Sequence, residues 1–136
     1  MILKINWSAV LTGFVVTLAL GFISGLIYTG STATGVLSYW GVIGILGGLA
    51  AGYIVGGKLG SGATHGGLAT VLGSVVVLVI AAFTTLLFGG LVPTLGVVVF
   101  GALIVAFHAI PGALGGALGA WLKDRRAAPE AVGTRA

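Results

Sequence analysis

Four long runs of apolar residues, separated by short polar or glycine-containing segments, make up most of the 136-residue chain. None of the runs contains a Lys, Arg, Asp or Glu, and they cover about 7–28, 36–57, 64–88 and 94–122. An uncharged apolar run of about 18 or more residues is typical of a membrane-spanning helix. The pattern predicts an all-α membrane protein with a four-span domain over residues 1–122 and a short, basic, disordered cytoplasmic tail over residues 123–136.

The composition supports the same interpretation. Hydrophobic residues make up 58 % of the chain and charged residues 6 %, whereas soluble domains carry roughly 25 % charged residues. The net charge of +4 rests on too few and too scattered basic residues for a nucleic-acid surface. The absence of cysteine excludes disulfides and thiolate metal sites. The partner expected from composition is the lipid bilayer.

The basic residues predict the orientation of the four spans. Lys4 precedes the first run, Lys58 separates the second from the third, and Lys123, Arg125 and Arg126 follow the fourth. With four spans, all three places lie on one side of the membrane, and basic residues favour the cytoplasmic side. We therefore expect a multi-pass protein of the cell membrane, folded as two helical hairpins with both termini cytoplasmic.

A segment near the second loop comes close to a phosphate-binding loop. Residues 52–58 read GYIVGGK, which fits GxxxxGK, but the next position is Leu59 instead of the Ser or Thr whose hydroxyl binds magnesium. The chain has two carboxylates to help hold a metal, Asp124 and Glu130, and both lie near its C-terminus. We expect no nucleotide binding and no other cofactor.

The glycines of this segment fit a helix-packing role. Gly48, Gly52 and Gly56 form two overlapping GxxxG units on one face of the second span. Helices in lipid associate by close backbone packing at such small-residue faces. Similar faces on the other spans predict a tightly packed bundle of the two hairpins. The predicted helix-packing residues are Gly44, Gly48, Gly52, Gly56, Gly66, Gly73, Gly112, Gly116 and Gly119.

The same glycine faces allow two kinds of contact. They can pack helices within one chain, or join the protein to a second copy or to another membrane protein. We expect a homo-oligomer or a membrane partner in addition to internal packing.

His108 is the titratable side chain expected deep within a span, on the glycine face of the fourth run. An ionisable residue inside a membrane is a candidate functional site. The alternative is a neutral imidazole that hydrogen-bonds to a neighbouring helix, near Pro111. His65 stands at the start of the third run, and two histidines without a nearby carboxylate are a poor metal site.

These residues favour a protein without enzymatic activity. No set of catalytic residues, paired carboxylates or metal ligands can be assembled from the spans. The alternative function is a channel or transporter for ions or small solutes, with a path near His108. An aqueous path calls for a continuous polar stripe, and the polar positions here are isolated between glycines.

Three segments resemble a family of small four-helix, glycine-rich membrane proteins from haloarchaea. The segments are INW (5–7), GGLAAGYIVGGKLGSGATHGGLATVLGS (47–74) and IPGALGGALG (110–119). The resemblance extends over about residues 5–122. It implies a four-helix architecture and a haloarchaeal source, and it implies no substrate or catalytic residues because we know of no established activity for that family.

Overall fold

The structure, a computed structural model, describes the backbone of residues 4–27 and 33–127. It describes the side chains of the same residues except those within 24–38. Most of the described residues belong to four α-helices. The helices are α1 (Trp7–Ile27), α2 (Ala33–Val55), α3 (Leu59–Gly89) and α4 (Leu91–Ala127). The expectation of an all-α chain with four helices is confirmed.

Two helices extend well past one end of the apolar runs that predicted them. α3 begins at Leu59, before the predicted start at residue 64, and α4 continues to Ala127, past residue 122. The glycines of the first α3 turns are poor helix formers, but Gly62 and Gly66 pack against α4. Tertiary contact therefore carries the helix through a segment of low helix propensity. The part of the predicted tail over 128–136 lies outside the described residues.

Glycine forms the tight connections between these helices. Gly90 alone separates α3 from α4, and its φ is 82°. Gly56 and Gly57 follow α2 with φ values of 59° and 74°. Side chains disfavour this left-handed region, which glycine adopts readily. The segment that resembles a phosphate loop is thus the end of α2 followed by a sharp turn into α3.

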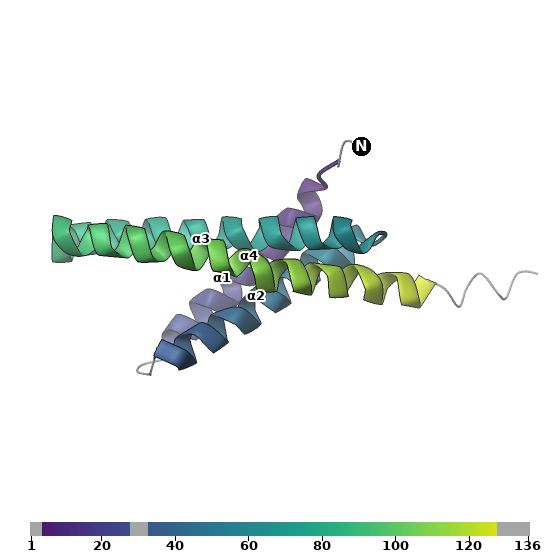
Figure 1. The fold of residues 1–136 in the computed structure, drawn as a ribbon, viewed down its shortest axis with the longest axis horizontal. Coiled ribbons are helices and arrows are strands. Elements are labelled where there is room, and N and C mark those ends of the chain that lie inside the picture. Colours follow the sequence, from purple (N-terminus) through teal and green to yellow (C-terminus); the bar gives the residue numbers. More distant parts are fainter. Residues whose placement is uncertain (1–3, 28–32, 128–136) are drawn as a thin grey trace, which may run out of the picture.

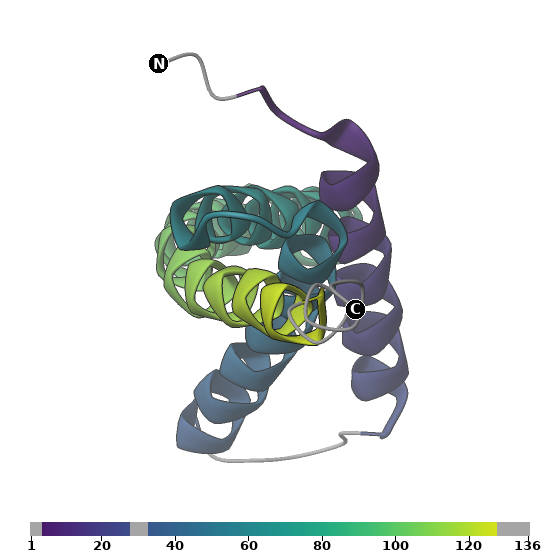
Figure 2. The same ribbon diagram turned by 90° about the vertical axis from the view of Figure 1, so that its right-hand side faces the viewer.

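The helices are arranged as two pairs that cross. α3 and α4 run side by side along the long axis of the molecule, and α1 and α2 cross them at an angle (Figure 1). α2 packs against α3 and α4, while α1 packs against α2 and α3. We call α3 and α4 together the long pair. The C-terminal end of α1 and the N-terminal end of α2 lie away from the long pair (Figure 2).

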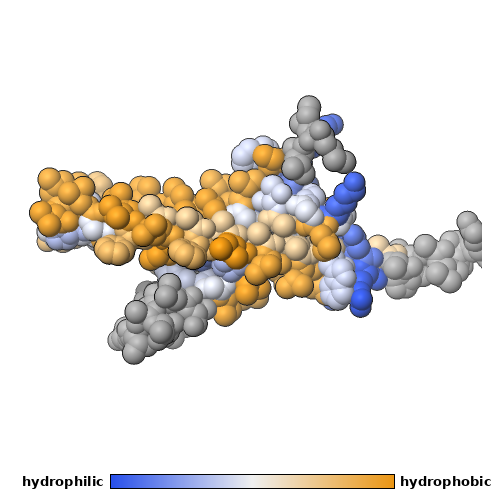
Figure 3. All heavy atoms as spheres, viewed as in Figure 1, coloured by the Kyte–Doolittle hydropathy of each residue, from blue (hydrophilic) through white to orange (hydrophobic). Residues whose placement is uncertain are grey.

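The buried core occupies one half of the long pair. The buried residues of α3 lie between Gly62 and Ser74, and those of α4 lie between His108 and Ala120. The other half, up to the turn at Gly90, exposes large apolar side chains such as Phe88, which is 87 % exposed. In the space-filling view, apolar residues cover the visible length of the long pair and hydrophilic residues gather at its opposite end (Figure 3).

Among the residues that the structure describes, two helices are long and apolar enough to cross a membrane, namely α3 and α4. The apolar stretches with described side chains in α1 and α2 are shorter, at Trp7–Ile23 and Tyr39–Val55. At 1.5 Å per residue, the 31 residues of α3 extend over about 46 Å. This length exceeds the roughly 30 Å of a hydrocarbon core, so α3 would tilt or project from a bilayer.

Candidate functional site

Glycines on α2, α3 and α4 bring the backbones of these three helices into direct contact. A β-carbon added at Gly48 of α2 would collide with the carbonyl oxygen of Gly112 on α4. Gly52, one turn later, has the same relation to Gly116. A β-carbon at Gly66 of α3 would meet the Gly112 carbonyl from the other side. A larger residue at any of these positions would push the helices apart.

Adjacent glycines on α4 face different neighbours. Gly115 faces the carbonyl of Ile45 on α2, whereas Gly116 faces the carbonyl of Gly62 on α3. Successive residues of a helix point about 100° apart, so a glycine pair opens two faces at once. Gly119 extends the contact with α2 by one turn. α4 is therefore closely packed on two sides.

The remaining glycines of the predicted packing set lie beside side chains. At each of these positions a side chain from another helix occupies the space that a β-carbon would take. The pairs are Gly44 with His108, Gly56 with Lys123, Gly73 with Thr17 and Gly112 with Thr70.

His108 joins α4 to α2. Its side chain is buried, and its Nε2 lies 2.8 Å from the carbonyl oxygen of Trp40. The centroids of the His108 imidazole and the Trp40 indole lie 5.3 Å apart, and the two ring planes are tilted by 59°. A carbonyl oxygen only accepts hydrogen bonds, so Nε2 carries a hydrogen and donates it to α2. The space that this ring needs is left by Gly44, where a β-carbon would come within 3.0 Å of Cδ2.

Thr70 joins α3 to α4 near the same histidine. Its hydroxyl lies 3.3 Å from the carbonyl oxygen of His108 on α4, and 3.1 Å and 3.0 Å from those of Gly66 and Gly67 on its own helix. The hydroxyl carries one hydrogen, so it donates to one of these carbonyls at a time. Pro111, inside α4, lacks the N–H that would complete the helix hydrogen bond one turn earlier. The carbonyl that this proline leaves without its helical donor is that of Phe107, so the Thr70 bond to the His108 carbonyl is a separate link between α3 and α4.

His65 joins α3 to the segment that leads into α1. Its side chain is 0 % exposed. The backbone N–H of Asn6 donates to Nε2 at 2.8 Å, and Nδ1 lies 2.7 Å from the carbonyl oxygen of Ser61. The Asn6 side chain accepts from the N–H groups of Ser8 and Ala9 and caps α1. His65 therefore holds the residue that immediately precedes α1.

Charged residues at the end of α4 hold the end of α2. The Lys123 ammonium donates to the carbonyl oxygen of Ile54 at 2.6 Å. The carboxylate of Asp124 accepts from the N–H of Gly57 at 3.0 Å. The last carbonyls of a helix lack helical partners and carry partial negative charge. These contacts therefore pair charges with the C-terminus of α2 and with the turn that follows it.

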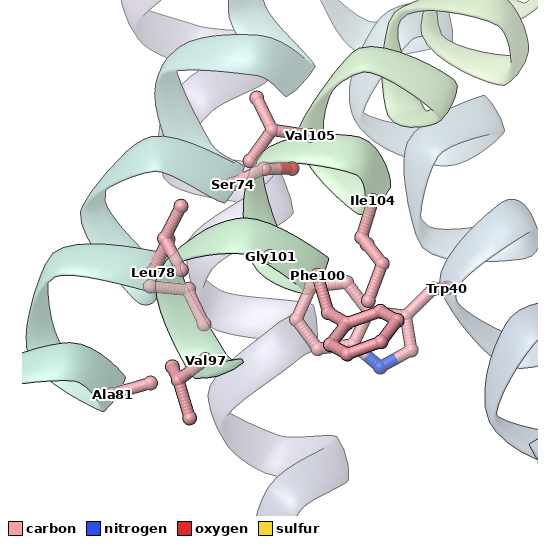
Figure 4. A pocket seen from close by; sticks show the side chains of 10 residues that line it. Trp40, Ser74, Leu78, Ala81, Val97, Phe100, Gly101, Ile104 and Val105 are labelled. Atoms are coloured by element: carbon pink, nitrogen blue, oxygen red, sulfur yellow. The ribbon is translucent and has the colours of Figure 1, made fainter. Parts of the chain in front are cut away.

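An apolar cavity of about 320 Å³ lies between α3 and α4, on the side of the buried core that is nearer to Gly90, and beside Trp40 of α2 (Figure 4). Aliphatic and aromatic side chains form nearly all of its lining. The hydroxyl of Ser74 is a polar group of the lining, and it already donates to the Thr70 carbonyl at 2.9 Å. This lining suits a hydrocarbon chain better than a hydrated ion.

A wider apolar groove of about 740 Å³ lies between α1 and α3. Val15 and Phe22 line its α1 side, and Val76 and Ile80 line its α3 side. Gly21 also lines this groove, and a β-carbon there would have nothing within 4 Å. The groove therefore offers an apolar surface with an open glycine position.

The described side chains form no group of three or more His, Asp or Glu residues that could hold a metal ion. Both histidines instead bond to backbone groups of other segments. Each ring thus links segments that lie far apart in the chain.

Fold and contacts together define a small all-α protein of four apolar helices joined by glycine contacts and histidine hydrogen bonds. The chain belongs to a family of unknown function (DUF5518), whose model matches residues 7–122. No curated protein and no solved structure matches the chain. Membership in a family without an assigned activity agrees with the resemblance noted in the sequence, and the haloarchaeal source stays a prediction.

Sequence reasoning missed two contacts. It assigned His65 to the start of a span without a partner, and it left Gly47 out of the packing set. A β-carbon at Gly47 would collide with the Thr17 hydroxyl of α1. The adjacent glycines at residues 47 and 48 were the available signal, because such a pair opens faces toward two neighbours. No sequence pattern indicates that Asn6, far away in the chain, would meet His65.

Proposed function

We propose that the protein is a four-span integral protein of the cell membrane that acts through helix packing, without catalysis, and that it self-associates. The observation that carries the helix-packing part of the proposal is the direct backbone contact of α2 and α3 with α4 around Gly112 and Gly116. Close backbone approach at small residues is the main way in which helices associate in lipid.

The apolar surface supports placement in a bilayer. The half of the long pair beyond Ser74 exposes large apolar side chains, including Phe83 and Phe100 at 63 % and 69 %. A soluble protein rarely exposes so continuous an apolar surface. The charged residues gather at the other end, where Lys123 and Asp124 contact the end of α2. This polarity suits a protein whose basic end faces the cytoplasm.

A second copy of the chain is the partner that we propose for the groove between α1 and α3. The packing glycines around Gly116 are already occupied within the chain, so self-association requires another surface. The groove is apolar, and Gly21 within it has open space in front of it. An open glycine position in an apolar groove allows a helix to approach closely.

The test is the mass of the protein in lipid nanodiscs, measured by native mass spectrometry. We expect a multiple of the 13.4 kDa chain mass. Ala19→Trp fills the groove and should return the protein to a monomer, because Ala19 lines it. Ala102→Trp places the same bulk on an exposed position of α4 and should leave the oligomer intact. A wild-type monomer at all protein-to-lipid ratios contradicts the proposal.

The alternative is a channel or transporter with a path near His108, and solute flux distinguishes it. The cavity beside this ring is about 110 Å³ and its described lining is largely apolar, while Nε2 is engaged with the Trp40 carbonyl. We expect liposomes with the purified protein to pass protons and small ions no faster than empty liposomes. Flux that is lost in a folded His108→Gln variant would establish the alternative instead.

A further inference from the structure

The two histidines hold their partners in chemically different ways. His65 accepts a hydrogen bond from the N–H of Asn6 through Nε2, and its Nδ1 faces the carbonyl of Ser61. Nε2 must therefore be unprotonated, and Nδ1 must carry the hydrogen. His108 faces the Trp40 carbonyl with Nε2. That bond needs a hydrogen on Nε2, which both the neutral and the protonated imidazole can supply.

We propose that His65 is an acid-released latch for the start of α1. A proton added to Nε2 turns the acceptor into a donor that points at the N–H of Asn6. Two donors cannot bond, and the His65 ring is buried whereas Asn6 is exposed, so the Asn6 segment must move away. The Trp40–His108 bond survives the same protonation. Acidification on the side of His65 therefore frees the entry to α1 and leaves the contact between α2 and α4 in place.

The charged and titratable groups at this end are bound elsewhere or lie on the exposed surface. Lys123 contacts the carbonyl of Ile54, Asp124 contacts the N–H of Gly57, and Arg126 contacts the hydroxyl of Tyr53. The other charged groups of the described residues at this end are Lys4 before α1, Lys58 before α3 and Arg125 on α4, all exposed. None of the hydrogen bonds described for the ring brings a carboxylate to His65, so no acidic partner would retain the protonated ring in place.

Release of Asn6 has a direct consequence for α1. The same residue caps the helix through its side-chain oxygen, which accepts from the N–H groups of Ser8 and Ala9. Displacement of its backbone disturbs this cap. The first turn of α1 should therefore fray on acidification, while the body of the helix, held by Val10 in the core, stays packed.

The test is ¹⁵N NMR of the protein in lipid nanodiscs. At about pH 8 the ring signals of His65 should report the neutral tautomer with hydrogen on Nδ1. The sample is then acidified from about pH 8 to about pH 5, and protonation of the ring is followed through its own ¹⁵N signals. Protonation should lower the exchange protection of the Asn6 amide about tenfold. A ring with hydrogen on Nε2 at the higher pH, or an Asn6 amide unchanged over the range, would overturn the latch.

Matched variants assign the transition to one histidine. His65→Gln offers a carbonyl oxygen in place of Nε2 and does not titrate, so it should keep Asn6 protected at every pH in the range. His108→Gln should retain the wild-type transition at Asn6. A transition that persists in His65→Gln would also overturn the proposal. If His65→Gln does not fold, the tautomer and the amide titration of the wild-type protein decide the matter without it.

Discussion

At the scale of single residues, the contacts around Gly116 explain why this position cannot carry a side chain. A β-carbon there would collide with the carbonyl oxygen of Gly62 and would lie 2.9 Å from the α-carbon of Gly66. These are backbone atoms within a helix, which cannot rotate away as a side chain can. Even alanine must therefore displace α3 from α4.

Gly116→Ala should lower the free energy of unfolding by about 1–3 kcal/mol, the usual cost of extra volume in a close-packed site. The matched control is Gly96→Ala on the same helix, where an added β-carbon has nothing within 4 Å. Alanine is the better helix former, so the control should be neutral or stabilising by up to about 1 kcal/mol. Reversible unfolding in mixed micelles measures both. Equal effects of the two substitutions would refute the backbone contact.

The two histidines show how far residue-level prediction reaches. For His108, helical periodicity indicated a position on the glycine face, and one of its two expected roles was a hydrogen bond to a neighbouring helix. The structure places such a bond at the Trp40 carbonyl. For His65, the partner is a backbone N–H that precedes α1. Nearly every residue has a backbone N–H, so the residue type at position 6 could not indicate this contact.

At the scale of helices, α4 depends on its two neighbours at different places. Glycines pack it against α2 and α3 over the half that contains Gly112 and Gly116, and charged groups hold its C-terminal end to α2. The N-terminal half of α4 has only α3 beside it over much of its length, as Figure 1 shows. The packing is therefore asymmetric along the helix.

Lys123→Met should loosen the ends of α2 and α4. The substitution keeps an apolar stem but removes the ammonium that donates to the Ile54 carbonyl, and the loss should be about 1 kcal/mol of unfolding free energy. Arg125→Met is the control, because the Arg125 guanidinium stacks on Trp121 of its own helix at 4.1 Å. The control should change stability by less than about 0.5 kcal/mol. A Lys123→Met variant as stable as Arg125→Met would show that the contact contributes nothing.

Hydrophobic runs predicted the existence and number of the helices but misplaced two ends. Composition alone suggested a break over the glycine-containing segment before residue 64, yet α3 already begins at Leu59. The reason is that Gly62 packs against α4, and a contact between distant segments is absent from local sequence. The charged residues after 122 were likewise assigned to a tail, although α4 continues to Ala127.

At the scale of the whole molecule, the two helical pairs cross and share one core at the end that carries the charged residues. The apolar helices α3 and α4 are each long enough to cross a membrane. The described apolar stretches of α1 and α2 are shorter, and in the proposed four-span topology both of these helices also cross the bilayer.

Cysteine labelling tests that topology most directly, and the chain has no native cysteine to interfere. Single cysteines at Lys4, Lys58 and Arg125 should react with a membrane-impermeant maleimide from the cytoplasmic face. Cysteines at Phe88, in the turn region between α3 and α4, and at Ser31, outside the described residues, should react from the opposite face. If Ser31 instead labels from the same face as Lys4 and Lys58, α1 and α2 do not cross the membrane and the four-span account is wrong.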